Sequence, residues 1–325
     1  MYIPSLCRRS TYETFANLHA IFVLPALGLA GLHMAALAPY VIPALIVVVP
    51  DYLFFRWNLV RNKAAVVAAA RLPGRVLRLD LDLPGRKPEP GQWVYVSVPE
   101  ISRTQAHPFS VCLPGTKDKG SPVTLFIKDM GKDTFSGQLF DLVPMPAFAS
   151  KSDETSVSVS DEARPFTVAV DGPYGRPSVD VDDAVAVVLV AGGIGATPIV
   201  SHLVSFLRDA NRDVAVTFSW VFREERAVEW FPDVLADATA DDRVDVSLHC
   251  TSLSSSGSAS ASGLVVSSGR PDYQDLFDEV KESGVARAVV LVCGPAGLVT
   301  SVYDAANACS SSSFAIDVSA ETFLF

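Results

Sequence analysis

The chain has 325 residues, enough for about two folded domains. It carries 26 Lys and Arg against 36 Asp and Glu side chains, a formal charge of −10, which argues against a nucleic-acid partner. With 49% hydrophobic and 19% charged residues, the composition excludes a disordered chain. Five cysteines in no CxxC spacing suggest neither a disulfide framework nor a zinc site, and they indicate a reducing compartment.

The N-terminal part is basic and apolar, unlike the acidic remainder. Two apolar runs, Leu18–Ala38 and Tyr40–Phe55, lie on either side of Pro39. The first is long enough to cross a hydrocarbon core of ~30 Å, whereas prolines interrupt the second and make it the weaker candidate. Arginines precede the first run and follow the second, so the positive-inside rule predicts a membrane hairpin of two transmembrane helices over residues 1–63 with the following domains in the cytosol. The alternative is a buried core hairpin of a soluble protein.

Two histidines lie inside the first run. His19 and His33 are 14 residues apart, ~40° short of four full helical turns, so both belong to nearly the same helix face, one near each membrane surface. Neutral imidazoles at two depths can each give one axial ligand to a haem iron. The alternative is that each histidine is a packing group.

After Lys63 the pattern changes to short alternating segments. Such segments with turn residues between them predict an antiparallel β-barrel domain, assigned to residues 64–178. The expected strands are Arg75–Leu81, Gln92–Val98, Val123–Lys128 and Phe166–Val170, with a turn over Leu83–Gly91.

From about residue 184 the pattern alternates between strand and helix. The unbroken apolar run Ala184–Ala191 is typical of a parallel strand buried on both faces. Residues 179–325 are therefore predicted to form a Rossmann-like α/β nucleotide-binding domain. Further expected elements are a helix over Ile199–Asp209, strands over Val214–Phe222 and Ala288–Val292, and loops over Ser150–Ala163 and Thr251–Gly263.

A glycine cluster, Gly192-Gly-Ile-Gly-Ala-Thr-Pro198, directly follows the first of these strands. Glycines let a pyrophosphate approach the backbone, and the next helix offers free N–H groups. The spacing is GGxGxxP rather than the usual GxGxxG, so a tight turn that needs positive φ is the alternative.

Four more strings occur in order with this cluster: His107-Pro-Phe-Ser110, Asp171-Gly-Pro-Tyr-Gly175, Gly269-Arg-Pro271 and Cys293-Gly-Pro295. Together the five resemble the ferric reductase and NADPH oxidase family, and Tyr12-Glu-Thr-Phe15 with the histidine pair looks like that family's fifth transmembrane helix. The resemblance implies a ferredoxin-reductase-like module, with an FAD-binding barrel followed by an NADPH-binding domain.

The same resemblance implies which residues bind FAD. His107, Pro108, Phe109 and Ser110 would lie against the flavin, Lys128 and Thr134 would reach its pyrophosphate, and Gly172 and Pro173 join the cofactor-binding set. A solvated strand lysine is the alternative for Lys128.

Another set is implied for NADPH. Gly192, Gly193 and Gly195 with Thr197 and Pro198 would hold the pyrophosphate, and Cys293 with Gly294 and Pro295 would lie near the nicotinamide. Arg223 and Arg270 would bind a 2′-phosphate and favour NADPH over NADH. The alternatives are a core cysteine and two surface arginines.

The C-terminal Phe325, in preference to Phe323, would stack on the flavin face that the nicotinamide later enters. The activity implied is electron transfer from NADPH through FAD to an acceptor, with a ferric chelate preferred and O2, reduced to superoxide, second. A non-catalytic, truncated membrane-anchored relative is the third possibility. The family has six transmembrane helices and this chain the last two, so haem b is expected here only if the missing helices are supplied.

Overall fold

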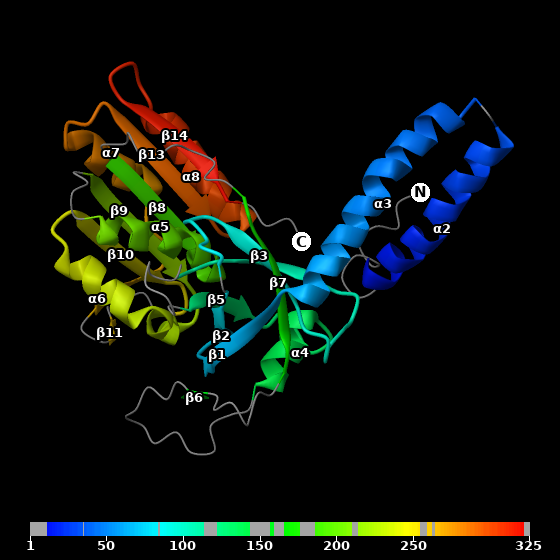
Figure 1. Ribbon diagram of the computed structural model, residues 1–325. Coiled ribbons are helices and arrows are strands. Elements are labelled where there is room, and N and C mark those ends of the chain that lie inside the picture. Colours follow the sequence, from blue (N-terminus) through cyan, green and yellow to red (C-terminus); the bar gives the residue numbers. More distant parts are fainter. Residues whose placement is uncertain are drawn as a thin grey trace.

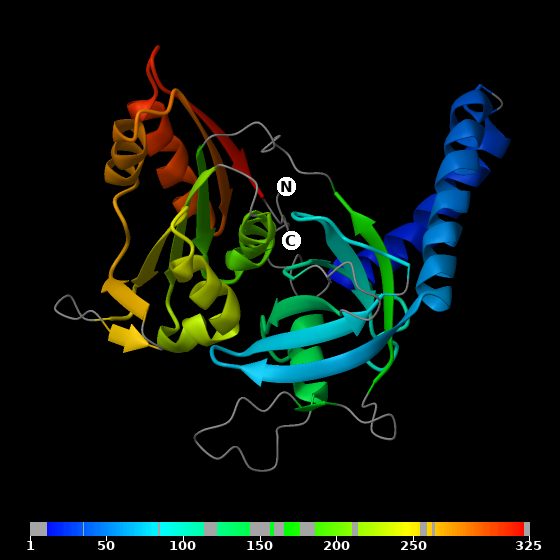
Figure 2. The same cartoon turned by 60° about the vertical axis from the view of Figure 1, so that its left-hand side comes forward.

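The computed structural model describes residues 12–34, 36–83, 85–113, 122–143, 157–158, 166–175, 186–209, 214–253, 259–261 and 264–321. A helical hairpin projects from a body made of two lobes, one for each of the predicted sheets (Figures 1 and 2). The ferredoxin-reductase-like arrangement expected from the sequence is therefore present.

The hairpin consists of α2 (Tyr12–His33) and α3 (Ala38–Arg61). Within the described residues, one helix is long and apolar enough to cross a membrane: Ala38–Leu59, whose most apolar 18 residues have a mean hydropathy of 1.8 and are not buried in the protein. The apolar stretch Ile21–His33 is shorter. The break between the two helices lies just before Pro39, as expected, but the expectation that prolines make the second run the weaker span was wrong. Pro43 and Pro50 lie inside α3, which is continuous from Ala38 to Arg61.

The first lobe is an antiparallel sheet in the order β4-β3-β7-β1-β2-β5, with β6 beside β1. Beyond β4, the Cys112 amide donates to the Thr124 carbonyl of β5 at 3.0 Å, so the chain that follows β4 reaches β5, although β4 and β5 themselves are not paired and form the two edges of the sheet. A helix, α4 (Phe135–Leu142), follows β5. The strands are β1 (Lys63–Leu72), β2 (Val76–Asp82), β3 (Trp93–Ser97), β4 (His107–Ser110), β5 (Val123–Lys128), β6 (Val157–Ser158) and β7 (Val168–Tyr174).

The second lobe is a sheet in the order β11-β12-β10-β9-β8-β13-β14, parallel except for β11. Apolar side chains bury β8 completely, as its sequence predicts, with α5 and α6 on one face and α7 and α8 on the other (Figure 1). Its strands are β8 (Ala186–Gly192), β9 (Ala215–Phe222), β10 (Val244–Cys250), β11 (Ala259–Ala261), β12 (Leu264–Ser268), β13 (Arg287–Cys293) and β14 (Ala315–Ala320). Its helices are η1 (Gly193–Gly195), α5 (Ala196–Arg208), η2 (Glu225–Trp230), α6 (Pro232–Ala240), α7 (Tyr273–Glu282) and α8 (Ala296–Cys309).

All seven predicted strands and the helix after the glycine cluster agree with the structure to within a few residues. The two expected loops each contain a short strand, β6 and β11. The sequence did not predict β4 as a strand, nor α4 as a helix.

The two lobes share an apolar seam. The Phe126 ring of the barrel packs edge-on against Phe231 with centroids 4.7 Å apart, and the Trp230 indole donates to the Pro73 carbonyl at 3.0 Å. Val76 and Cys112 of the barrel are fully buried in the same cluster as the second lobe's core. The seam fixes the position of one lobe against the other.

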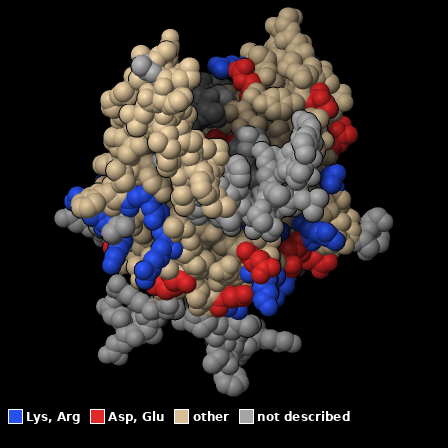
Figure 3. Space-filling view, turned by 90° about the vertical axis from the view of Figure 1, so that its right-hand side faces the viewer, with Lys and Arg blue, Asp and Glu red and all other residues tan. Residues whose placement is uncertain are grey.

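Charge is unevenly distributed over the face that carries the hairpin. Figure 3 shows a hairpin surface almost without charged side chains and a group of Lys and Arg side chains at its base. Arg61 and Lys63, both exposed, mark the point where α3 passes into β1. This distribution is typical of a helix that leaves an apolar phase and enters water.

Candidate functional site

The glycine cluster lies where strand order reverses in the second sheet. From β8 the chain next adds β9 on one side and later β13 on the other, which makes the end of β8 a switch point of the kind at which nucleotides bind. Gly193 has a φ of +55°, and the space beyond its Cα is open. The Trp220 indole donates to the Gly193 carbonyl at 3.1 Å, so the turn is held from the core side.

The other two glycines of the cluster serve close backbone packing. A Cβ on Gly195 would lie 2.6 Å from the Cys293 carbonyl oxygen, and one on Gly192 would lie 2.8 Å from Pro295 Cδ. A Cβ on Gly294 would lie 3.0 Å from the Gly192 Cα, so these two glycines also pack closely. The GGxGxxP and CGP strings, more than 90 residues apart, therefore form one structure.

Cys293 is the last residue of β13 and is 3% exposed. Burial, with a further contribution from the Glu321 carboxylate, raises the pKa of its thiol to about 12. The side chain is thus a neutral thiol at physiological pH. Glu321 follows β14, and its amide donates to the Val292 carbonyl at 2.9 Å. Phe325 and Phe323 lie outside the described residues.

Arg223 and Arg270 lie at the carboxyl edge of the same sheet, and both are exposed. Arg223 directly follows β9, Arg270 follows β12, and β10 lies between these strands, so about 10 Å separates the two strand ends. The Cys250 thiol donates to the Arg223 carbonyl at 3.7 Å, which fixes the backbone there.

On the barrel side, β4 carries the HPFS string as an edge strand. The His107 ring stacks on Phe135 of α4 with centroids 4.4 Å apart, and Phe109 lies 6.3 Å from the same ring. Ser110 is buried, and burial lowers the pKa of His107. Phe135 is a site residue that the sequence interpretation missed, because nothing in a short apolar helix predicts a stack on His107.

Lys128 and Thr134 lie at the two ends of the loop after β5. Lys128 is exposed at the end of the strand. Thr134 caps α4: its hydroxyl donates to the Gly131 carbonyl at 2.7 Å and accepts from the Gly137 amide at 3.1 Å. A Cβ on Gly137 would lie 1.9 Å from the Gly131 oxygen, so this loop folds tightly onto the start of the helix.

Gly172 and Pro173 lie in β7, joined by a cis peptide bond. Gly172 has a φ of +126°, and a Cβ there would lie 3.3 Å from the Trp93 carbonyl. The neighbouring Tyr174 hydroxyl donates to Asp171, and its ring lies 5.1 Å from that of Trp93. The DGPYG string therefore lies beside β3 and its aromatic side chains.

The two halves of the site meet at the turn before β3. The Gly91 amide donates to Ser201 Oγ of α5 at 3.2 Å, and a Cβ on Gly91 would lie 2.8 Å from His202 Nε2 and 3.8 Å from Glu321 Oε1. His202 is 3% exposed, and burial lowers its pKa to about 4. The sequence interpretation did not select these residues; a histidine within the apolar helix that follows the glycine cluster was the available signal.

The histidines expected to bind haem iron, His19 and His33, both lie on α2 at exposed positions. Within the described part of the chain, no group of three or more His, Cys, Asp or Glu side chains is placed to hold a metal ion. The haem assignment stays a prediction.

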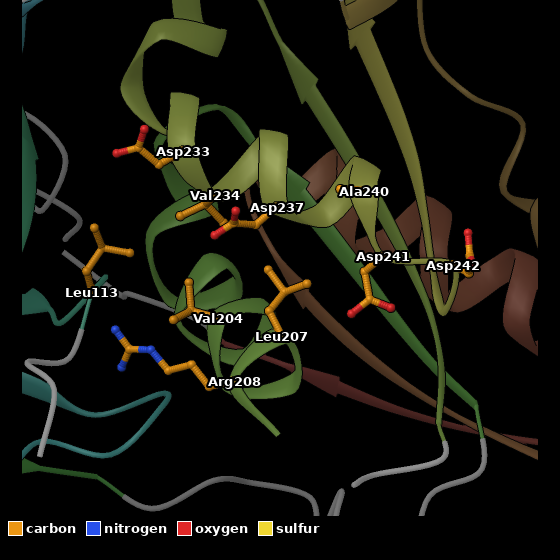
Figure 4. Close-up of a pocket in the computed structure, with 10 residues that line it drawn as sticks. All are labelled: Leu113, Val204, Leu207, Arg208, Asp233, Val234, Asp237, Ala240, Asp241 and Asp242. Atoms are coloured by element: carbon orange, nitrogen blue, oxygen red, sulfur yellow. The ribbon is translucent and has the colours of Figure 1, made fainter. Parts of the chain in front are cut away.

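A separate pocket of about 600 Å³ lies at the opposite end of α5 from the glycine turn (Figure 4). From α5 it is lined by two apolar side chains and Arg208, and on the side of α6 it carries four aspartates. The residues that line it are Leu113, Val204, Leu207, Arg208, Asp233, Val234, Asp237, Ala240, Asp241 and Asp242.

Comparison with known protein families assigns the five strings to two domains, HPFS and DGPYG to one and the other three to the second. Residues 185–307 match the ferric reductase NAD binding domain, and residues 61–178 match an FAD-binding domain. The chain belongs to the ferric reductase and NADPH oxidase family. Its two lobes are therefore the FAD-binding and NAD(P)-binding domains of that family, as the sequence predicted.

Curated relatives carry names of the same family. Respiratory burst oxidase homolog protein B of Arabidopsis thaliana is 26% identical over 278 residues, which cover 70% of this chain and 32% of the relative. Human NADPH oxidase 4 is 24% identical over 290 residues, 84% of this chain and 48% of the relative. This family member thus spans between a third and a half of the length of these relatives.

Solved structures support the fold. The FAD- and haem-bound flavohemoglobin of Malassezia yamatoensis superposes with a TM-score of 0.55 at 15% identity, over 79% of this chain and 59% of the other. The CS-b5R domains of human Ncb5or superpose with a TM-score of 0.58 at 17% identity, over 80% and 69%. Two features fit the two cofactors: an open, positive-φ glycine turn at a helix start suits a pyrophosphate, and the stacked rings of His107 and Phe135 suit a flavin.

Proposed function

We propose that this chain is a membrane-bound NADPH-dependent flavoprotein oxidoreductase that passes electrons from NADPH through FAD to a one-electron acceptor. The observation that carries the proposal is the contact between the lobes at the turn before β3: the Gly91 amide of the barrel and Ser201 of α5 are joined by a buried hydrogen bond. Ser201 lies three residues after the GGxGxxP string, and the Gly91 carbonyl oxygen lies 3.8 Å from the Cβ position of Gly175 in the DGPYG string. Bound FAD supplies the chemistry of accepting a hydride and releasing electrons singly.

The residues of this chain bind the two cofactors and orient their rings. Gly193 and the first N–H groups of α5 bind the NADPH pyrophosphate, and Arg223 with Arg270 bind the 2′-phosphate through their guanidinium groups. The neutral Cys293 thiol packs against the nicotinamide, for which a buried, uncharged side chain is suited. No general base is needed, because hydride transfer requires contact between the two rings and exclusion of water.

His107, Pro108, Phe109 and Ser110 hold the flavin along β4, where the stack of His107 on Phe135 keeps the strand in place. Lys128 complements the charge of the FAD pyrophosphate. Thr134 acts through the loop that it caps, since its hydroxyl already makes two hydrogen bonds. Gly172 and Pro173 would bring β7 against the same ring system, and the role of Phe325, which lies outside the described residues, stays a prediction.

The acceptor is a second part of the proposal. The names of the curated relatives favour O2, reduced to superoxide, and the name of the matched NAD-binding family favours a ferric chelate. Both are one-electron acceptors. The apolar α3 and the basic residues at its base support a membrane location with the two lobes on the cytosolic side.

The test uses the full chain in detergent with FAD. Under anaerobic conditions we expect NADPH to bleach the flavin absorbance within seconds, and ferricyanide to restore it. A preparation that does not retain FAD would contradict the proposal and favour the non-catalytic alternative. The same holds if the bound flavin stays oxidised after NADPH is added.

The same preparation distinguishes the acceptors. Superoxide appears as cytochrome c reduction that superoxide dismutase suppresses, whereas ferric reduction appears as Fe²⁺ captured by a chelator under argon. If this preparation gives only the second signal, O2 is not the acceptor.

A further inference from the structure

The end of α3 is attached to the barrel at three points, all on the half of the sheet that carries the HPFS and DGPYG strings. The Phe55 ring contacts Tyr95 of β3 with centroids 5.2 Å apart. Tyr95 pairs with Pro108 on one side and Asp171 on the other, so the contacted residue lies between both strings. The Val170 amide of β7 donates to the Asn62 carbonyl at 3.0 Å.

The third attachment is a charged side chain. Arg56, one turn before the buried Leu59, donates from Nη1 to the Thr104 carbonyl at 3.1 Å and from Nη2 to the Arg103 carbonyl at 2.5 Å. A guanidinium presents two donors in a fixed plane and therefore suits two successive carbonyl groups. The bond joins the membrane helix to the loop that connects β3 to β4.

Hydrogen bonds within the barrel also hold this loop. Ser97 Oγ donates to the Gln105 carbonyl at 2.8 Å, and the amides of Thr104 and Gln105 both donate to Ser102 Oγ at 3.3 Å. His107, the first residue of β4, follows Gln105 by two residues. A displacement of the loop at the Arg103 and Thr104 carbonyls is therefore transmitted directly to the start of the strand.

We propose that Arg56 is a positioning residue for the flavin: it locks the β3–β4 loop to the membrane helix and so sets where His107–Ser110 hold the isoalloxazine ring. This inference rests on the proposed function and adds the contact by which the membrane helix positions the flavin site. Electrons then leave the flavin at an edge whose position is fixed relative to α3.

The test compares the full chain in lipid nanodiscs as wild type, R56Q, R56K and R61Q. Arg61 is the matched control, because it is exposed, carries the same charge and lies on the same helix. The measurements are FAD affinity from flavin fluorescence, the fine structure of the bound flavin's absorbance band, NADPH affinity and the melting temperature.

We expect R56Q to weaken FAD binding about tenfold and to broaden the flavin band, as the loss of two charge-assisted hydrogen bonds implies. R56K should fall between R56Q and wild type, since an ammonium group serves the two carbonyls less well than a fork. R61Q should equal wild type, and NADPH affinity should be the same in all four proteins.

If R56Q and R61Q bind FAD equally well, with equal spectra, the proposal is wrong. If R56Q fails to fold, R56K decides, and a wild-type FAD affinity and spectrum in R56K overturns the positioning role. Wild-type protein that binds no FAD would instead refute the proposed function, so the two failures are distinguishable.

Discussion

At the scale of single residues, the glycines of one motif have different functions that their spacing does not reveal. Gly193 adopts a positive φ beside open space, whereas Gly195 lets the turn approach the end of β13. The Gly195→Ala variant should lose about 2–4 kcal/mol of unfolding free energy, because its Cβ would lie 2.6 Å from the Cys293 carbonyl, a backbone atom. NADPH affinity should fall with it. Calorimetry and NADPH titration measure both.

Gly297 of α8 supplies the matched control, because nothing lies within 4 Å of its Cβ position. A Gly297→Ala variant should be unchanged or slightly more stable, by less than the ~1 kcal/mol gained in a helix interior, because Gly297 lies in the first turn of α8. Equal losses in the two variants would mean that Gly195 does not make the close approach. The sequence indicated a glycine-dependent turn here, but the partner strand lies almost 100 residues further along the chain, and spacing cannot supply such a contact.

At the scale of elements, strands buried on both faces were predictable and an edge strand was not. The run that forms β8 is apolar throughout, whereas β4 contains Pro108 and is too short for alternation to be recognised. Proline is tolerated in β4 because this strand lies at the edge of the sheet. The site on this strand was found through its four-residue string, and its stack on α4 depends on a fold that the string does not encode.

The two arginines at the carboxyl ends of β9 and β12 are predicted to determine the preference for NADPH over NADH. Arg223→Ala should raise the KM for NADPH about tenfold or more and leave that for NADH unchanged, since NADH has no 2′-phosphate for the guanidinium to bind. Arg226→Ala is the control: Arg226 lies three residues on, is exposed and is paired with Glu229 at 2.6 Å. Steady-state kinetics with both nucleotides measures the effect, and an equal change in the two KM values for Arg223→Ala would refute the assignment.

At the scale of the whole molecule, the contact between the lobes at the turn before β3 is the feature that the sequence could not indicate. Its members come from a turn, a helix and the segment after the last strand: Gly91, Ser201, His202 and Glu321. None belongs to a recognised string, and their contacts exist once both lobes have folded. The membrane helix was visible in the composition, but its docking through Arg56 was not, because the acceptors are backbone carbonyls and leave no trace in residue identity.

His202, the buried histidine at this contact between the lobes, makes the stability of the whole molecule depend on pH. Burial lowers the pKa of His202 from 6.5 to about 4, so the unfolded chain takes up a proton at a higher pH than the folded one. The stability that comes from burying a neutral His202 is fully present above pH 6.5. It is lost progressively as the pH falls towards 4, and the total loss in unfolding free energy is about 3 kcal/mol. Urea titrations of wild type and His202→Leu from pH 7.5 to 4.5 isolate this loss, since the other titrating groups, His107 included, are common to both proteins. The wild type should lose stability relative to the variant steadily below pH 6.5; a constant difference across this range would show that His202 is protonated in the folded protein as readily as in the unfolded chain.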